Sequence, residues 1–204
     1  MRVITNGAYV PEEVSRVPSE VLRFGSVGRM VALKGQSILL DAISILAETL
    51  GQAAQEKFQL KFYGAGPVEE DLREQASKLP QGLVEFCGEV DDLELIYENL
   101  DVLVVSSRSE GLSMVIIEAM ARRIPTVATE VGGNPTLVRP GNTGILVPYG
   151  DPRSLAEAML EFVQDRSKVK DYGETARELI EDKFSLAKTH QAYLECYQNE
   201  PQST

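Results

Sequence analysis

Residues 101–121 read DVLVVSSRSEGLSMVIIEAMA and combine a short strand, a polar loop and a helix. The run 102–105 is apolar and mostly β-branched, which is typical of a buried strand, while residues 114–121 contain strong helix formers. Glu110 therefore falls in the loop after the strand, and Glu118 falls on the first turns of the helix. In open α/β sheets ligands bind at such loops, because backbone amides and the positive end of the helix dipole converge there.

The rest of the chain repeats this alternation of strand and helix patterns. We expect six strands, at residues 22–27, 58–63, 84–87, 102–105, 126–128 and 145–147. The clearest helix covers residues 35–50, where apolar residues recur every three or four positions and Gly51 follows as a stop. The predicted fold is α/β, a doubly wound, mostly parallel, Rossmann-like sheet of about six strands with helices on both faces.

Three parts of the chain differ in pattern. Residues 1–20 contain two prolines and no clear period, so we interpret them as a linker or edge segment. Residues 21–184 form the predicted Rossmann-like domain, which turns all-helical after residue 147. Residues 185–204 form a last helix and tail, and the apolar stripe on this helix, with Leu186, Tyr193 and Tyr197, needs a covering surface.

Three helix starts are expected from a capping residue followed by proline. They are Gly66-Pro67, Asn134-Pro135 and Asp151-Pro152.

Composition limits the class of protein. The 204 residues are 43% hydrophobic and 25% charged, with no run of eighteen apolar residues, which indicates a compact domain without a membrane span. The net charge of −11 disfavours nucleic acid and strong membrane contact. Two cysteines and one histidine make a disulfide framework or a structural zinc site improbable. We see no secretion signal at the N-terminus and expect a cytoplasmic protein.

A loop with two cations follows the first predicted strand. Arg29 and Lys34 are suited to holding a diphosphate, Arg29 as a planar fork and Lys34 as a point charge. Because Lys34 precedes Gly35, the order is the reverse of a Walker A loop. Two solvated loop cations are the alternative interpretation.

Two glycine pairs also follow predicted strands. Gly64 and Gly66 imitate a dinucleotide fingerprint, but Glu69 stands where its third glycine belongs, so a simple turn is favoured. Gly132 and Gly133 would let a ligand approach the backbone, although paired glycines also simply make turns.

The position of these loops after predicted strands favours a ligand-binding function. A doubly wound sheet brings the loops with Arg29 and Lys34, with Glu110, and with the Gly-Gly pair onto one rim. Cations for a diphosphate, a helix-start carboxylate for ribose hydroxyls and a loop carboxylate for sugar hydroxyls together describe a nucleotide-sugar site.

In its ordered motifs the chain resembles the C-terminal, donor-binding domain of GT-B fold, retaining glycosyltransferases of group 1, also called family 4. The matching segments are 3–7, 27–29 with 34–35, 62–67, and 109–121 followed by 132–135. The two glutamates that this family spaces seven residues apart fall on Glu110 and Glu118.

The resemblance implies a role for each matching residue. Arg29 and Lys34 would neutralise the donor diphosphate and the leaving group, so no metal or cofactor is expected. Glu118 would accept hydrogen bonds from the ribose, and Glu110 would orient the transferred hexosyl group. The residues that would line the donor site through backbone or apolar contacts are Gly28, Val90, Gly111, Leu112 and Ser113.

The resemblance also implies what is missing. Such enzymes have an N-terminal domain that binds the acceptor, and the last helix would pack toward it, so this chain alone should bind a UDP-, GDP- or ADP-sugar without transferring sugar. Thr136 stands where the family usually has glutamate, which leaves a degenerate donor domain with a binding or regulatory role as an alternative. A nicotinamide-dependent dehydrogenase that uses Gly64 and Gly66 is a weaker alternative.

Overall fold

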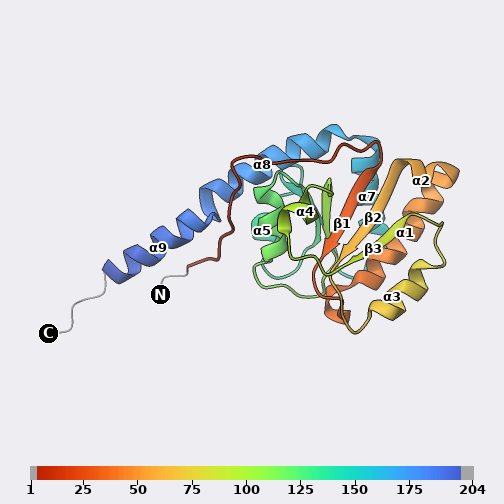
Figure 1. The fold of residues 1–204 in the computed structure, drawn as a ribbon, viewed down its shortest axis with the longest axis horizontal. Helices are drawn as coiled ribbons and strands as arrows, with labels where there is room; N and C mark the ends of the chain where they lie inside the picture. Colours follow the sequence, from red (N-terminus) through yellow and green to blue (C-terminus); the bar gives the residue numbers. More distant parts are fainter. Residues whose placement is uncertain (1–3, 199–204) are drawn as a thin grey trace.

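The computed structural model describes residues 4–198 as a six-stranded sheet covered by helices on both faces (Figure 1). The strands are β1 (Leu22–Val27), β2 (Phe58–Tyr63), β3 (Val84–Gly88), β4 (Val102–Val105), β5 (Thr126–Thr129) and β6 (Gly144–Val147). Their order is β3-β2-β1-β4-β5-β6, and every neighbouring pair is parallel. The prediction of a doubly wound α/β sheet is confirmed. Val3 of the first matched segment and tail residues 199–204 lie outside the described residues.

Two layers of helices enclose separate hydrophobic cores. The helices are α1 (Gln36–Leu50), α2 (Ala54–Lys57), α3 (Glu69–Ala76), α4 (Leu93–Tyr97), α5 (Met114–Ala121), α6 (Asn134–Leu137), α7 (Pro152–Gln164), α8 (Ser167–Lys183) and α9 (Leu186–Gln198), with 3-10 turns η1 (Ala32–Lys34) and η2 (Gly51–Ala53). Helices α1 and α7 bury Leu39, Ile43 and Phe162 on one face of the sheet, while α5 and α8 bury Ile116 and Ile180 on the other. The central strands β4 and β5 are buried along their whole length, as expected for a parallel sheet covered on both faces.

Only one of the three predicted helix starts is confirmed as written. The Asp151 carboxylate caps α7 by accepting hydrogen bonds from the amides of Arg153 and Ser154. Helix α3 begins two residues after Pro67, and Asn134 is the buried first residue of α6 with Gly133 as its cap. The Asn134 side chain instead donates to the Thr129 carbonyl oxygen, which ties α6 to β5.

By length and composition alone, the stretch Gln36–Lys57 is long and apolar enough to cross a membrane. Its mean hydropathy is 1.3. Its first part, α1, packs against α3 and α7 and buries Leu39, Ile43 and Leu46 in the core. The packing identifies α1 as a core helix of this domain.

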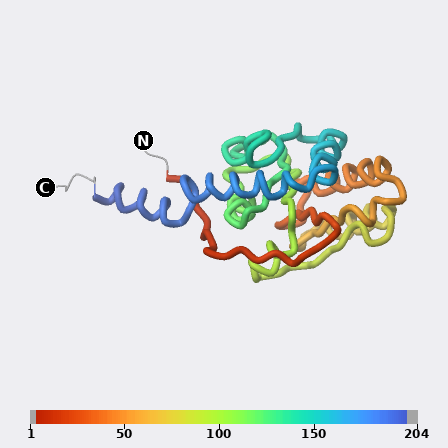
Figure 2. The backbone as a smooth tube through the Cα atoms, turned by 90° about the horizontal axis from the view of Figure 1, so that it is seen from above, coloured from red at the N-terminus to blue at the C-terminus, as the bar shows by residue number. Residues whose placement is uncertain are grey.

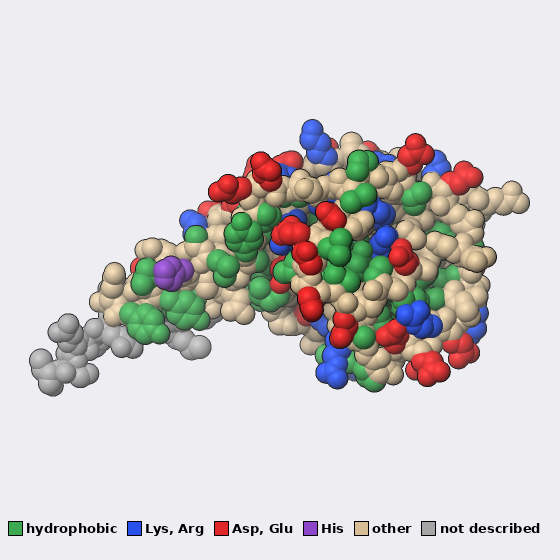
Figure 3. Space-filling view, in the orientation of Figure 1, with side chains coloured by type: hydrophobic (Ala, Val, Ile, Leu, Met, Phe, Trp, Pro, Cys, Tyr) green, Lys and Arg blue, Asp and Glu red, His purple; other side chains and the backbone are tan. Residues whose placement is uncertain are grey.

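The N-terminal segment meets the C-terminal helices. The amide of Ala8 donates to the Phe184 carbonyl oxygen, and the amide of Leu186 donates to the Ala8 carbonyl oxygen, both over 2.9 Å. Figures 1 and 2 show α9 extending from this junction beyond the body of the domain. Figure 3 shows hydrophobic side chains and the one histidine together on α9, and Tyr193 and Tyr197 are 46% and 73% exposed. The predicted apolar stripe is thus uncovered within the described chain.

Candidate functional site

The loops after β1 and β4 meet at the carboxyl edge of the sheet. Strands β1 and β4 are neighbours, so the point where the strand order reverses lies between them. The amide of Arg108 donates to the Leu33 carbonyl oxygen over 2.8 Å, and the Ser106 hydroxyl donates to the Lys34 carbonyl oxygen over 3.0 Å. These bonds fix the two loops against each other at the switch point.

A cavity of about 680 Å³ opens at this edge. It is lined by Val27, Gly28, Arg29, Tyr63, Gly64, Ala65, Gly66, Glu89, Val90, Asp91, Leu93, Ile96, Val115 and Glu118. The structure therefore brings together four of the residues expected at the donor site, namely Gly28, Arg29, Val90 and Glu118. The volume lies within the usual range for small-molecule sites.

Lys34 and Glu110 lie beside this cavity in a small adjoining hollow that shares Val27 and Val115 with it. The Lys34 ammonium is 2.8 Å from Oε1 of Glu110, and the Ser107 hydroxyl donates to the same oxygen over 2.6 Å. Both expected residues are therefore present, but they are paired with each other, and Arg29 lines a different hollow from Lys34.

The start of α5 presents unused backbone donors. Within residues 4–198, the N–H groups of Gly111, Leu112 and Ser113 have no hydrogen-bond partner. They precede the first turn of an eight-residue helix, where the dipole favours negative charge. The loop that carries Glu110 thus offers an anion free amide donors and a favourable helix dipole.

Glu118 is held by a tyrosine that sequence reasoning missed. The Tyr97 hydroxyl donates to Oε2 of Glu118 over 2.9 Å, and the tyrosine side chain is completely buried. Arg122 lies over the Tyr97 ring, 5.0 Å from its centroid, and pairs with Glu94 of α4. Burial and the adjacent Glu118 raise the pKa of Tyr97 well above its ordinary value, so the hydroxyl remains a donor. Nothing in the sequence marked Tyr97 as a partner of Glu118.

Replacing Tyr97 with phenylalanine should weaken ligand binding at Glu118 by roughly threefold to tenfold, because one hydrogen bond that orients the carboxylate is lost. The ring and its contact with Arg122 remain, so the unfolding midpoint should change little. Isothermal titration and thermal unfolding of the same sample measure both quantities. An unchanged affinity would show that Tyr97 does not position Glu118.

Both glycine pairs are explained by the packing of one loop on another. A Cβ at Gly132 would lie 1.7 Å from the Glu110 carbonyl oxygen, and a Cβ at Gly66 would lie 2.1 Å from the Met30 carbonyl oxygen. The amide of Gly133 also donates to the Gly111 carbonyl oxygen over 2.9 Å. The Gly-Gly turn thus packs against the Glu110 loop and supports it. The close backbone contact of Gly66 accounts for that glycine, so a dinucleotide site is not needed to explain it.

Comparison with known families identifies the family of this chain. The family model described as glycosyl transferases group 1 matches residues 22–165, which include the whole carboxyl edge. The chain belongs to the group 1 glycosyl transferases. The resemblance expected from the sequence motifs is confirmed.

Curated relatives of this group 1 chain are glycosyltransferases by name. An uncharacterised glycosyltransferase of Methanocaldococcus jannaschii is 33% identical over 164 residues, which cover 79% of this chain and 44% of the relative. A lipopolysaccharide core biosynthesis glycosyltransferase of Rhizobium meliloti is 30% identical over 208 residues, covering 98% of this chain and 58% of the relative. The chain spans about half the length of the relatives it matches.

Solved structures share the GT-B architecture. A glycosyltransferase from Rickettsia africae superposes with a TM-score of 0.83 at 22% identity, covering 97% of this chain and 56% of that one. Anabaena HepE in complex with UDP and glucose gives a TM-score of 0.78 at 23% identity, covering 89% of this chain and 49% of that one. At these identities the likeness supports the fold.

Proposed function

We propose that this chain is the C-terminal, nucleotide-sugar-binding half of a retaining glycosyltransferase that transfers a hexosyl group from an NDP-sugar to an acceptor. The observation that carries the proposal is the 680 Å³ cavity at the switch point, with Arg29 and Glu118 in its wall, together with the free amides of residues 111–113 in the loop after β4. Cation, carboxylate and amide donors at one edge match the three parts of a nucleotide sugar: diphosphate, ribose and hexose.

In this proposal Glu118 receives the ribose hydroxyls. Its Oε2 is already engaged by Tyr97, which fixes the carboxylate and leaves Oε1 for the ligand. Val90 lies on the same cavity and provides an apolar surface for the base. Arg29, which is exposed at the mouth, would close over the diphosphate as a planar fork.

The leaving diphosphate would be stabilised by protein groups and not by a metal ion. Lys34 pairs with Glu110, and the free amides of residues 111–113 follow Glu110 directly in the same loop, so charge that develops on the leaving oxygen would meet fixed donors. Glu110 would direct the sugar hydroxyls, and its bonds from Lys34 and Ser107 keep its carboxylate oriented. In the adjacent Gln36, which is buried, the side-chain oxygen has no partner within the described residues and could accept from a further hydroxyl.

The comparisons support this proposal. One structural neighbour, Anabaena HepE, was solved with UDP and glucose, with UDP and with UDP-glucose. Because the chain covers only about half of its relatives, we propose that a second, N-terminal domain binds the acceptor and that the uncovered stripe of α9 faces it.

Isothermal titration of the chain with UDP, GDP and ADP, without metal and with NADH as control, tests the proposal. We expect saturable binding of one diphosphate and none of NADH. Binding of NADH alone would instead favour the dehydrogenase alternative, and the identity of the bound diphosphate would name the base.

Replacing Lys34 with glutamine should weaken binding of the nucleoside diphosphate by about tenfold, because one charge-assisted contact with the phosphate is lost. The corresponding monophosphate lacks the second phosphate and should lose much less affinity. Lys78→Gln is the matched control, since the Lys78 side chain is 72% exposed beyond the end of α3 and lines neither hollow of the site. Equal losses for the diphosphate and the monophosphate would place Lys34 away from the second phosphate.

A further inference from the structure

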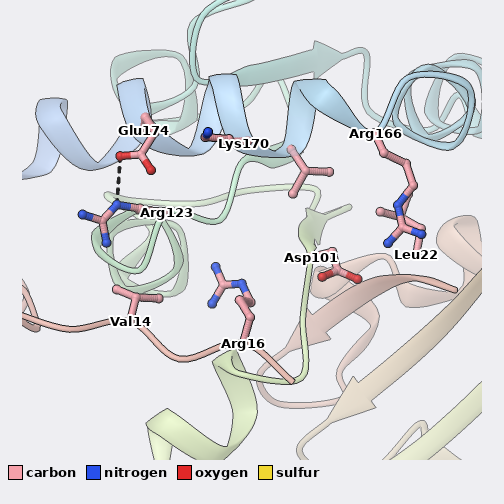
Figure 4. Close-up of a pocket in the computed structure, with 9 residues that line it drawn as sticks. Val14, Arg16, Leu22, Asp101, Arg123, Arg166, Lys170 and Glu174 are labelled. Carbon is pink, nitrogen blue, oxygen red and sulfur yellow. Dashed lines mark hydrogen bonds and ion pairs between the residues drawn. The ribbon is translucent and has the colours of Figure 1, made fainter. Parts of the chain in front are cut away.

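A second cavity, of about 330 Å³, lies at the opposite, amino edge of the sheet. Its wall is built from residues 14 and 16 of the N-terminal segment, the first residue of β1, Asp101 before β4, Arg123 after α5, and the first turns of α8. Figure 4 shows Arg16 pointing into this space between Asp101 and Arg123, toward Lys170 and Glu174 on α8. Four stretches that are distant in the sequence thus enclose one space.

Four cations and two carboxylates line the cavity, and both carboxylates are already neutralised. Asp101 accepts from Nε and Nη2 of Arg23, at 3.1 and 3.0 Å. Glu174 pairs with Nε of Arg123 at 2.9 Å. Within the described part of the chain, the remaining cations form no ion pair; they are Arg16, Arg166 and Lys170. In a chain of net charge −11, such a cluster is unexpected on grounds of composition.

Arg16 is the most constrained of these cations. Its guanidinium donates to the carbonyl oxygens of Tyr97 and Arg122, at 3.2 and 2.6 Å, which fixes its position without neutralising its charge. Burial and the neighbouring guanidinium groups lower the pKa of Arg16 to about 10, against the opposing attraction of Asp101. A partly buried cation that forms no ion pair is unfavourable, so an anion in the cavity would relieve this cost.

Arg123 contributes a further unusual feature. It has a φ of 56°, in the left-handed region, where a helix commonly ends with glycine. It is the one non-glycine residue with positive φ among residues 4–198. The arginine is held there with its side chain on the cavity, although the left-handed conformation costs about 1 to 2 kcal/mol.

We propose that this cavity binds the phosphate group of a small phosphorylated metabolite, separately from the donor cavity. A phosphomonoester carries close to two negative charges at neutral pH and three acceptor oxygens, which match Arg16, Arg166 and Lys170. Val14, Leu22 and Val169 provide an apolar wall for the rest of the molecule. The volume is at the lower end for small-molecule sites, which fits a ligand of the size of a sugar phosphate.

Ligand binding in this cavity would also stabilise the position of the N-terminal segment, residues 14–20. Arg166 donates to the carbonyl oxygens of Ser19 and Glu20, and Arg16 belongs to the same segment. A ligand shared by Arg16 and α8 therefore ties residues 14–20 to the start of α8. Amide hydrogen exchange in this segment should slow when the ligand binds.

The test is a heteronuclear NMR titration of the chain with inorganic phosphate and with glucose 6-phosphate, using glucose and sodium chloride of matched ionic strength as controls. We expect saturable shifts of the amides of residues 14–16, 101 and 166–170 with the phosphate compounds only. Hydrogen exchange of residues 14–20, measured on the same samples, gives the second readout.

The double variant Arg166→Gln with Lys170→Gln should weaken binding at least about tenfold, because two charge-assisted contacts are lost. Both side chains are exposed, so the fold should be retained. Lys183→Gln on the same helix is the matched control and should bind as the unmodified chain does. The proposal is overturned by shifts confined to the carboxyl edge, by the absence of saturable shifts, or by unchanged binding in the double variant.

Discussion

Replacing Glu118 with alanine should weaken binding of the preferred nucleoside diphosphate by roughly 10- to 100-fold. Hydrogen bonds to a charged group contribute about 1.5 to 3 kcal/mol, and each 1.4 kcal/mol is tenfold in affinity. Glu118 lies in the wall of the large cavity, and its carboxylate is fixed there by Tyr97, so little reorganisation is needed when the ribose binds. Isothermal titration measures the loss.

The variant Glu118→Gln separates this contact from a structural effect. Glutamine can still accept the Tyr97 hydrogen bond, so the unfolding midpoint should be retained while nucleotide affinity falls by a smaller factor than in Glu118→Ala. Glu157→Ala on the exposed side of α7 is the control and should leave affinity unchanged. If both Glu118 variants bound as the unmodified chain does, the ribose assignment would be wrong.

Replacing Gly132 with alanine should destabilise the domain by about 3 kcal/mol and abolish nucleotide binding. The residue has a φ of 53°, and an added Cβ would lie 1.7 Å from the Glu110 carbonyl oxygen. The left-handed backbone accounts for about 1 kcal/mol and the forced shift of the loop for about 2 kcal/mol. For a domain of this size the unfolding midpoint should fall by roughly 6 to 12 °C.

Gly141→Ala is the matched control for Gly132→Ala. Gly141 has a φ of 72°, but a Cβ added there would have no atom within 4 Å. It should therefore show only the backbone effect, a fall of about 2 to 4 °C, with nucleotide binding retained. Equal effects of the two substitutions would mean that the contact with Glu110 does not hold the loop.

The fold was predictable because the apolar runs of the strands are short and well separated, and the run of β4 is buried along its whole length. All six strands were expected, and β1, β2 and β4 have the expected bounds. The helix starts at Pro67 and Asn134 were wrong because glycine and proline also make turns, and the local sequence does not distinguish a turn from a cap.

The site was predictable in part. The strand-loop-helix pattern placed Glu110 and Glu118 at the carboxyl edge, and the doubly wound order brought the loop of Arg29 beside them. The pairing of Lys34 with Glu110 and the support from Tyr97 depend on side-chain contacts between segments far apart in the sequence. The cationic cavity combines residues from four such segments, so no local motif could reveal it.

The central claim is that a nucleoside diphosphate binds at the switch point between β1 and β4. The most direct measurement is a heteronuclear NMR titration of the chain with UDP, GDP and ADP, which locates the binding site as well as detecting it. We expect one diphosphate to shift the amides of Gly28, Val90, residues 111–113 and Glu118 in a saturable way. Shifts confined to other parts of the molecule, or none with any of the three at millimolar concentration, would contradict the claim.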